Sequence, residues 1–143
     1  MKKIFTVFII YFLFHNLSLA EDRNFQSIGK VGGELYLLDY NSIKSGEGDE
    51  IKYIQLISFE KKQNTSDGKK YQSVQMYMKG KCNKNMNKPY ILQFYDVQMN
   101  DGNTMKGNIV RTSKFGGDWN IPKEGTAYDV VLKEACKAWS LKN

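Results

Sequence analysis

The N-terminal segment constrains this chain most, because it has the pattern of an export signal. Lys2 and Lys3 directly precede Ile4, and residues 4–14 are apolar apart from one threonine. Small residues then stand at Ser18 and Ala20, just ahead of an acidic pair. This is the three-part layout of a secretory signal peptide cleaved after Ala20. The apolar run of 11 residues is shorter than the roughly 20 that a transmembrane helix needs, so no transmembrane anchor is expected.

Cleavage would leave residues 21–143, a length that suits one domain with one core. It would remove Lys2 and Lys3, leaving 19 of the 21 basic residues against all 15 acidic ones, a formal charge of +4. Two interpretations of this charge stay open. It either reflects a lysine- and asparagine-rich composition without functional meaning, or it attracts anionic glycans, lipid headgroups or cell-wall polymers. Nucleic-acid binding is not expected of an exported and mildly basic chain.

The predicted mature chain contains no histidine, because His15 is the only one. Catalysis by an acyl-transfer triad or by an imidazole general base is therefore excluded for the mature chain. Carboxylates that could hydrolyse a glycan, such as Asp96 and Glu124, lie in or beside turns where acidic residues are ordinary. The glycines around Val31 lack the ending of a phosphate-binding loop. We expect no enzyme activity and no cofactor.

Cys82 and Cys136 are the two cysteines of the chain. An even number in an exported protein favours a disulfide over free thiols, although two unlinked buried cysteines are the alternative. A metal site is not expected, because two thiolates without histidine leave zinc short of its usual ligands. The methionines favour core and edge packing over copper(I) binding.

Between residues 25 and 115, short runs of β-branched and aromatic residues are interrupted by turn clusters. This punctuation predicts an antiparallel meander. The clearest hairpin signals are Asp67-Gly68 and Asp101-Gly102. We expect strands over residues 25–31, 34–39, 51–62, 71–82, 90–99 and 104–114.

The last segment changes to a helical period. An apolar stripe with the spacing of one helix face is formed by Tyr128, Val131, Leu132, Ala135, Cys136 and Trp139. The stripe predicts a helix over residues 126–141, with Thr126 as its N-cap and Asp129 in a weak capping arrangement. Trp119 and Trp139 are expected to close opposite ends of the interface between this helix and the sheet.

Alternation along the strand before Cys82 agrees with the helical stripe. It places Val74, Met76 and Met78 on one side together with Cys82. The other side takes Tyr71, Ser73, Gln75, Tyr77 and Lys79. A bond between Cys82 and Cys136 would thus pin the helix to the more apolar side. The predicted fold is α+β, a roughly six-stranded antiparallel sheet with a C-terminal helix packed on one face and tied to it by a disulfide.

With this layout assembled, the sequence resembles the bacterial surface-adhesin E family over most of the predicted mature chain. The resemblance is carried by Ile28-Gly29, Leu35-Tyr36-Leu37-Leu38-Asp39, Ser42-Ile43-Lys44, Cys82, Phe94-Tyr95-Asp96, Trp119-Asn120-Ile121-Pro122 and Cys136. It implies a six-stranded antiparallel sheet with a disulfide-tied C-terminal helix, as the spacing also suggests. The founding member is lipid-anchored and binds host extracellular-matrix proteins. This chain has no cysteine directly after Ala20, so we expect a periplasmic, cell-surface or secreted protein without a lipid anchor.

Lysines gather near two predicted strand ends with tyrosines beside them. The candidate binding residues are Lys69, Lys70, Tyr71, Tyr77, Lys84, Lys88 and Tyr90. Tyrosine suits interfaces because it buries area at low entropic cost. The competing interpretation is a solvated sheet edge that lysines protect from aggregation.

The leading functional prediction is an exported, non-catalytic binding module of the adhesin E type with a protein or glycan partner. The alternative is a periplasmic inhibitor or immunity-type protein that blocks a cell-wall-active enzyme or toxin. The positive charge counts against inhibition of basic lysozymes, which favours an acidic surface. A homodimer is left open.

Overall fold

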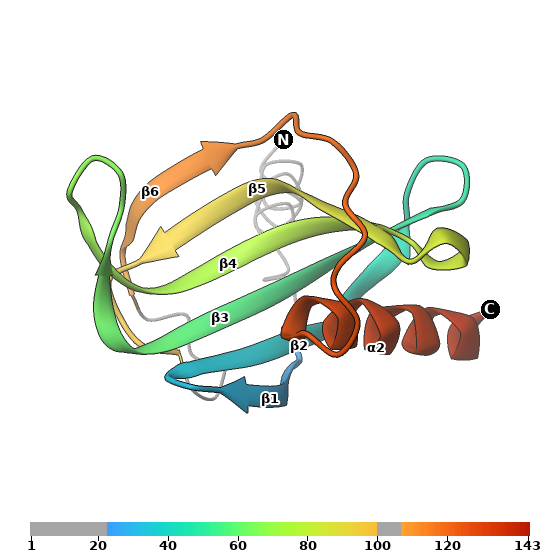
Figure 1. The fold of residues 1–143 in the computed structure, drawn as a ribbon, viewed down its shortest axis with the longest axis horizontal. Coiled ribbons are helices and arrows are strands. Elements are labelled where there is room, and N and C mark those ends of the chain that lie inside the picture. Colours follow the sequence, from blue (N-terminus) through green and yellow to red (C-terminus); the bar gives the residue numbers. More distant parts are fainter. Residues whose placement is uncertain (1–22, 100–106) are drawn as a thin grey trace, which may run out of the picture.

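The computed structural model describes residues 23–99 and 107–143. It shows a six-stranded antiparallel sheet with its strands side by side in chain order, and one long helix against it (Figure 1). The elements are β1 (Phe25–Val31), β2 (Glu34–Ser45), β3 (Glu50–Asn64), β4 (Lys70–Lys81), the 3-10 turn η1 (Cys82–Lys84), β5 (Met86–Tyr95), β6 (Ile109–Lys114) and α2 (Ala127–Lys142). The predicted fold class is confirmed. The signal peptide and the Asp101-Gly102 turn lie outside the described residues.

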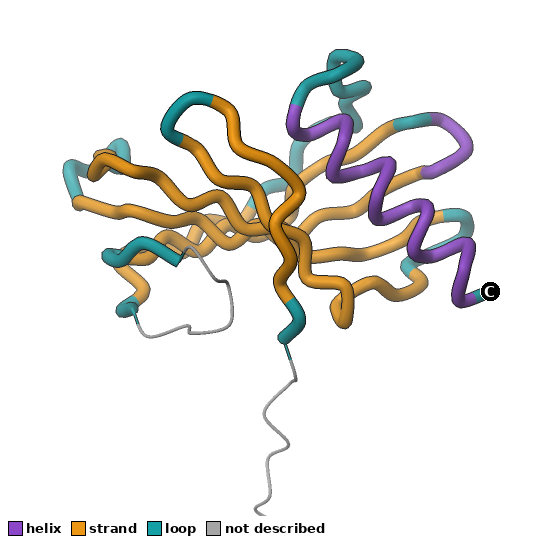
Figure 2. The backbone as a smooth tube through the Cα atoms, turned by 90° about the horizontal axis from the view of Figure 1, so that it is seen from below, coloured by secondary structure: helices purple, strands orange, loops and turns teal. Residues whose placement is uncertain are grey.

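Helix α2 lies on one face of the sheet, mainly over β2 (Figure 2). Its buried residues Val131, Leu132 and Ala135 join the larger apolar cluster with residues of β2, β3 and β4. Leu132 packs so closely on β4 that any side chain larger than that of glycine opposite it would force a shift. A Cβ built at Gly80 would lie 2.8 Å from Leu132 Cδ1. No helix in the described part of the chain is long and apolar enough to cross a membrane.

The face away from the helix carries a second, smaller apolar cluster that includes Phe25, Leu56 and Met99. The segment after β5 crosses this face, because Met99 N donates to Ser58 Oγ at 3.0 Å and Ser73 Oγ donates to Val97 O at 2.7 Å. The side of β4 predicted to be more polar is therefore partly covered as well. Ser73 and Gln75 are both buried.

Three strands differ clearly in extent from their predictions. β6 begins at Ile109 instead of residue 104, since the described residues 107 and 108 are not part of a strand. β2 continues past residue 39 to Ser45, because Ser42 bridges the interrupted ladder. Its hydroxyl donates to Asp39 O at 2.6 Å and accepts from Ile54 N at 2.8 Å. β5 spans Met86–Tyr95 instead of 90–99, because Asn85 makes the turn in a left-handed conformation at φ 49°. Pro89 is tolerated inside β5 because the β4–β5 register shifts there, as at a bulge.

The disulfide between Cys82 and Cys136 is confirmed, with the two Cα atoms 5.6 Å apart. Cys82 belongs to η1 rather than to the preceding strand. The bond therefore ties the middle of α2 to the turn between β4 and β5. A second tie lies close by, because Asn85 Nδ2 donates to Asp129 Oδ1 at 3.1 Å. The same end of the sheet is thus held to the helix covalently and by a polar contact.

The helix starts at Ala127, and its predicted cap is only partly right. Thr126 occupies the N-cap position, but its hydroxyl donates to Lys123 O instead of accepting a helix N–H. Asp129 reaches back to accept from Gly125 N at 3.0 Å and pairs with Lys133 Nζ at 2.8 Å. The carboxylate, and not the hydroxyl, stabilises this end of the helix.

We expect Asp129 to make the fold sensitive to acid. The Lys133 ammonium first, then the N–H of Gly125 and the Asn85 amide, lower the pKa of Asp129 from its ordinary 3.8 to about 2. Because the pKa of Asp129 is lower in the folded than in the unfolded protein, its ionised carboxylate stabilises the fold at pH values above the unfolded pKa. This stabilisation is lost as the pH falls from about 4 to about 2. Urea unfolding at several pH values in this window should show that the free energy of unfolding falls more steeply for the wild type than for Asp129→Asn. Asp49→Asn, in an exposed turn, is the matched control. Parallel loss in the wild type and Asp129→Asn would contradict the assignment.

Candidate binding surface

The predicted lysine and tyrosine residues lie at two opposite ends of the sheet, so they do not form one surface. Lys69, Lys70 and Tyr71 belong to the β3–β4 hairpin end, at the left of Figure 1. The η1 end, at the right, has Tyr77, Lys84, Lys88 and Tyr90 on or beside it. From Lys70 to Lys79 the strand rises about 30 Å, at roughly 3.3 Å per residue.

At the hairpin end the contacts are those of local structure. Lys69 Nζ donates to Val110 O at 3.1 Å and lies 3.7 Å from Asp67 Oδ2, which ties the hairpin to β6. Tyr71 packs edge-on against Phe59 and Phe94, with ring centroids 5.7 and 4.9 Å away. It belongs to the helix-side cluster, and not to the side of Tyr77 as alternation predicted. The exposed Lys70 pairs with Asn64 across the hairpin.

At the η1 end, tyrosines and lysines are interleaved. Tyr77 and Tyr90 meet edge-on with ring centroids 6.1 Å apart. Lys52 Nζ and Lys79 Nζ each lie 5.8 Å from the centroid of the Tyr90 ring. Lys84 is exposed in η1. Ammonium groups at this distance from an aromatic ring are attracted by its quadrupole.

The strand register at this end brings four lysines into one row. Lys44 pairs with Lys52, Lys52 with Lys79, and Lys79 with Lys88, across β2, β3, β4 and β5. Directly paired residues of antiparallel strands point to the same face. That face is opposite the helix, because the neighbours of Lys52 on β3, Ile51 and Tyr53, belong to the helix-side cluster. We call Lys44, Lys52, Lys79 and Lys88 the lysine ladder.

Trp119 extends the ladder at its β5 end. Its ring lies 4.7 Å from Lys81 Nζ and 5.0 Å from Lys88 Nζ. The backbone pairing of Asn120 with Asn87 holds this segment beside β5, with N···O distances of 2.9 Å in both directions. Trp119 was expected at the helix–sheet interface, where Trp139 does pack. Instead its ring contacts Lys81 and Lys88. Nothing in the local sequence predicts this role.

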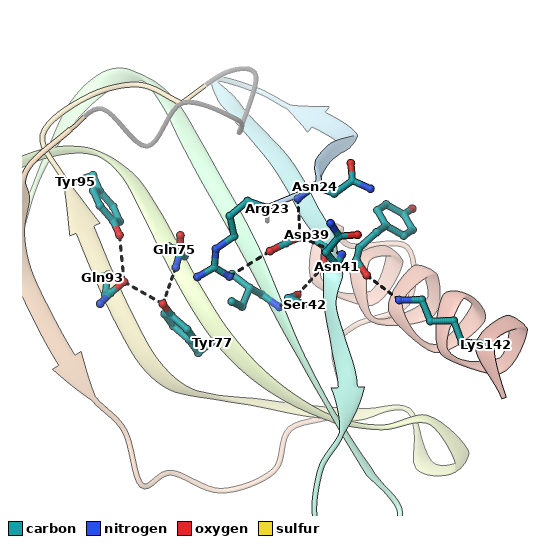
Figure 3. A network of polar contacts seen from close by, with 12 residues as sticks. Arg23, Asn24, Asp39, Asn41, Ser42, Gln75, Tyr77, Gln93, Tyr95 and Lys142 are labelled. Carbon is teal, nitrogen blue, oxygen red and sulfur yellow. Dashed lines mark hydrogen bonds and ion pairs between the residues drawn. The ribbon is translucent and has the colours of Figure 1, made fainter. Parts of the chain in front are cut away.

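Next to the ladder, the same face holds a polar network (Figure 3). Tyr77 OH accepts from Gln75 Nε2 at 2.8 Å and donates to Gln93 Oε1, to which Tyr95 OH also donates. Burial raises the pKa of Tyr95, while the nearby Arg23 guanidinium acts in the opposite direction. The hydrogen bonds to Tyr77 OH fix the orientation of the Tyr77 ring. They thereby also position the Tyr90 ring, which packs edge-on against it.

Arg23 and Asp39 lie between this network and β1. Arg23 Nη1 donates to Asp39 Oδ2 at 3.2 Å, and the buried carboxylate also accepts from Asn24 N at 2.9 Å. On the other face, Lys142 Nζ donates to Tyr40 O at 3.1 Å and holds the end of α2 against β2 (Figure 3). The contacts of Arg23 and Asn24 with Asp39 thus hold the segment before β1 against the face where the ladder lies.

A separate groove of about 450 Å³ lies on the helix side of the sheet. Its walls are mainly apolar and include Met76, Met78 and Tyr128, with Asn87 and Thr126 at polar positions. Tyr128 OH lies 3.9 Å from Met76 Sδ. The residues that the structure describes contain no cluster of three or more histidine, cysteine or acidic side chains that could hold a metal ion.

Comparison with known proteins identifies the fold by family. The family model for surface-adhesin protein E matches residues 25–137, which is most of the chain. This chain belongs to the surface-adhesin protein E family. No curated protein and no solved structure was found to match it. The resemblance inferred from the sequence is therefore confirmed.

Proposed function

We propose that this protein is an exported, non-catalytic binding module that recognises a protein or glycan partner outside the inner membrane. Membership of the surface-adhesin protein E family carries the proposal, because an adhesin acts by binding. The signal-peptide pattern over residues 1–20 supports export. In this proposal the mature protein starts at Glu21 and has no lipid anchor.

The recognition surface in this proposal is the η1 end of the face opposite the helix. Exposed or half-buried lysines alternate there with Tyr90 and Trp119, and Tyr77 forms the inner edge. Aromatic side chains are enriched at binding surfaces, and complementary charge around them favours encounter with an oppositely charged partner. Of the predicted binding residues, Tyr77, Lys88 and Tyr90 belong to this surface, and Lys84 is exposed in the adjoining η1 turn. Lys69, Lys70 and Tyr71 lie at the hairpin end instead. No contact in the described residues favours the inhibitor alternative.

Export and binding are tested together on the protein as the cell makes it. We expect fractionation to find it in the envelope or the medium, with an intact mass that starts at Glu21. The purified protein should bind at least one extracellular-matrix protein or glycan in an immobilised panel. Cytoplasmic retention with residues 1–20 still attached would contradict the proposal. Surface protease shaving separates outward display from periplasmic retention, and sedimentation velocity tests the predicted option of a homodimer.

A further inference from the structure

The lysine ladder is a continuous line of positive charge across four strands. Neighbouring strands lie about 4.8 Å apart, so the three steps from Lys44 to Lys88 span roughly 14 Å. Lys81 adds a fifth ammonium beside the last step, over the same Trp119 ring as Lys88. The line runs perpendicular to the strands and lies on the face that α2 leaves open.

Such a row is unfavourable for the isolated fold. Like charges directly opposite each other on a sheet repel, and here this happens three times in succession. Among the described residues, Glu50 is the one carboxylate within ion-pair distance of a ladder lysine, 3.9 Å from Lys79 Nζ. The rings of Tyr90 and Trp119 offset part of the repulsion and hold the ammonium groups in place. The ladder is thus a preorganised row of ammonium groups whose charges are neutralised only to a small extent by nearby carboxylates.

We propose that the lysine ladder binds a linear sulfated polysaccharide, with successive anionic groups of the chain pairing with successive strands. The inference rests on the proposed binding function and names the chemistry of its partner. An extended polysaccharide advances with each sugar unit by a distance close to the spacing between strands. Sulfate groups on neighbouring units then meet neighbouring lysines without any change in the sheet. Charge complementarity along a line, and not an apolar pocket, carries the recognition.

Two other anionic partners fit the ladder less well. A bilayer is flat, whereas the side chain of Lys79 is only 24% exposed and Lys52 and Lys88 are half-buried. A thin chain reaches such partly buried side chains more easily than a layer of headgroups does. A single-stranded nucleic acid gains affinity by stacking bases on open aromatic rings. Here the rings of Tyr90 and Trp119 are already flanked by two lysines each.

The test compares three forms of the full mature protein. The ladder variant carries Lys44→Gln, Lys52→Gln, Lys79→Gln and Lys88→Gln. The control variant has the same change in net charge at four exposed lysines elsewhere, with Lys61→Gln, Lys62→Gln, Lys123→Gln and Lys137→Gln. Calorimetric titration with heparin, a sulfated polysaccharide, is run at several salt concentrations. A rescue variant replaces the four ladder lysines by arginine, which keeps the charge.

We expect the wild type and the control variant to bind heparin and the ladder variant to lose that binding. Four ion pairs correspond to a slope of about −3 in the logarithm of affinity against the logarithm of salt, or roughly a 50-fold loss between 50 and 200 mM. The ladder variant should lose at least that much at the lower salt concentration and show a nearly flat salt dependence. The arginine variant should bind. The melting temperature of the ladder variant should stay close to that of the wild type, since relief of three like-charge contacts is offset by loss of the Lys79–Glu50 ion pair and of the lysine–ring contacts.

Specific results would overturn the inference. Equal binding of heparin by the wild type and the ladder variant would do so, as would an equal loss in the control variant. Ladder-dependent binding of phosphatidylserine vesicles or of oligo-dT without binding of heparin would assign the surface to another partner. The proposed function is judged separately on the immobilised matrix panel. If the ladder variant binds the panel as the wild type does and heparin is not bound, only the ladder inference fails. If the wild type binds neither heparin nor the panel, the proposed function fails too.

Discussion

Replacing Cys82 or Cys136 with serine should lower the free energy of unfolding by about 4 kcal/mol. The bond joins two residues 54 positions apart in the sequence, and in the chain-entropy model a loop of this length restricts the unfolded chain by about that amount. The loss is large against the 5–15 kcal/mol that is typical of small domains, taken as an order of magnitude. Urea unfolding of the oxidised wild type and of both variants measures it.

The double variant provides the internal control for the disulfide. Cys82→Ser with Cys136→Ser should be little less stable than either single variant, because one bond is lost in all three. Reduction of the wild type should bring its unfolding midpoint to that of the variants. If the exported protein has two thiols that alkylate under native conditions, the bond does not exist in the cell and the assignment is wrong.

Leu132→Ala should cost about 2–5 kcal/mol, because it opens a cavity between α2 and the sheet. Leu132 is fully buried and lies against the Gly80 position of β4. The matched control is Leu141→Ala in the same helix, where the side chain is 80% exposed. That change should stay within about 0.5 kcal/mol of the wild type. Equal effects at the two positions would show that α2 does not present the face that the structure assigns to it.

Gly80→Ala sharpens this test through a double-mutant cycle. Alone, the added methyl group would crowd Leu132, Ile51 and Tyr53 and should cost about 1–3 kcal/mol. In the Leu132→Ala background the methyl group enters the space that the leucine has left. The two changes together should therefore cost less than the sum of their separate effects. Strict additivity would mean that Gly80 and Leu132 are not in contact.

The helix could be predicted because it depends on a local pattern, and the disulfide because an even number of cysteines in an exported chain favours pairing. The apolar stripe from Tyr128 to Trp139 has the helical period, and Cys136 lies on it. The strand that leads to Cys82 could be predicted in the same way. Both predictions need only the spacing of residues within one element. The family resemblance agreed with them and is confirmed by the match over residues 25–137.

The lysine ladder could not be predicted, because it depends on the register between strands. Its members are spread from Lys44 to Lys88, and irregularities in the pairing shift β2 against β3 and β4 against β5. A shift of one residue moves a side chain to the other face of the sheet. The sequence placed Lys69 and Lys88 at two different strand ends but offered both for one candidate surface, although they lie at opposite ends of the sheet. Lys44 and Lys52 gave no local signal at all.

Local sequence patterns also could not predict that the sheet face opposite the helix is partly buried. Alternation assigned Ser73 and Gln75 to the more polar side, which is the usual outcome for a sheet with one solvated face. The structure covers them because the segment ending at Met99 folds back over β3 and β4. That cover is a contact between residues far apart in the sequence. It leaves the η1 end of the same face open, which is where the ladder lies.

The most direct test of the recognition surface is to map amide chemical shifts by NMR while a sulfated heparin oligosaccharide is added to the full mature protein. The predicted result is that the largest shifts fall on Lys44, Lys52, Lys79 and Lys88 and on the indole N–H of Trp119, while residues of α2 and of the β3–β4 hairpin change little. Largest shifts in the groove at Met76 and Tyr128, or at the hairpin around Lys69, with the ladder unchanged, would contradict it.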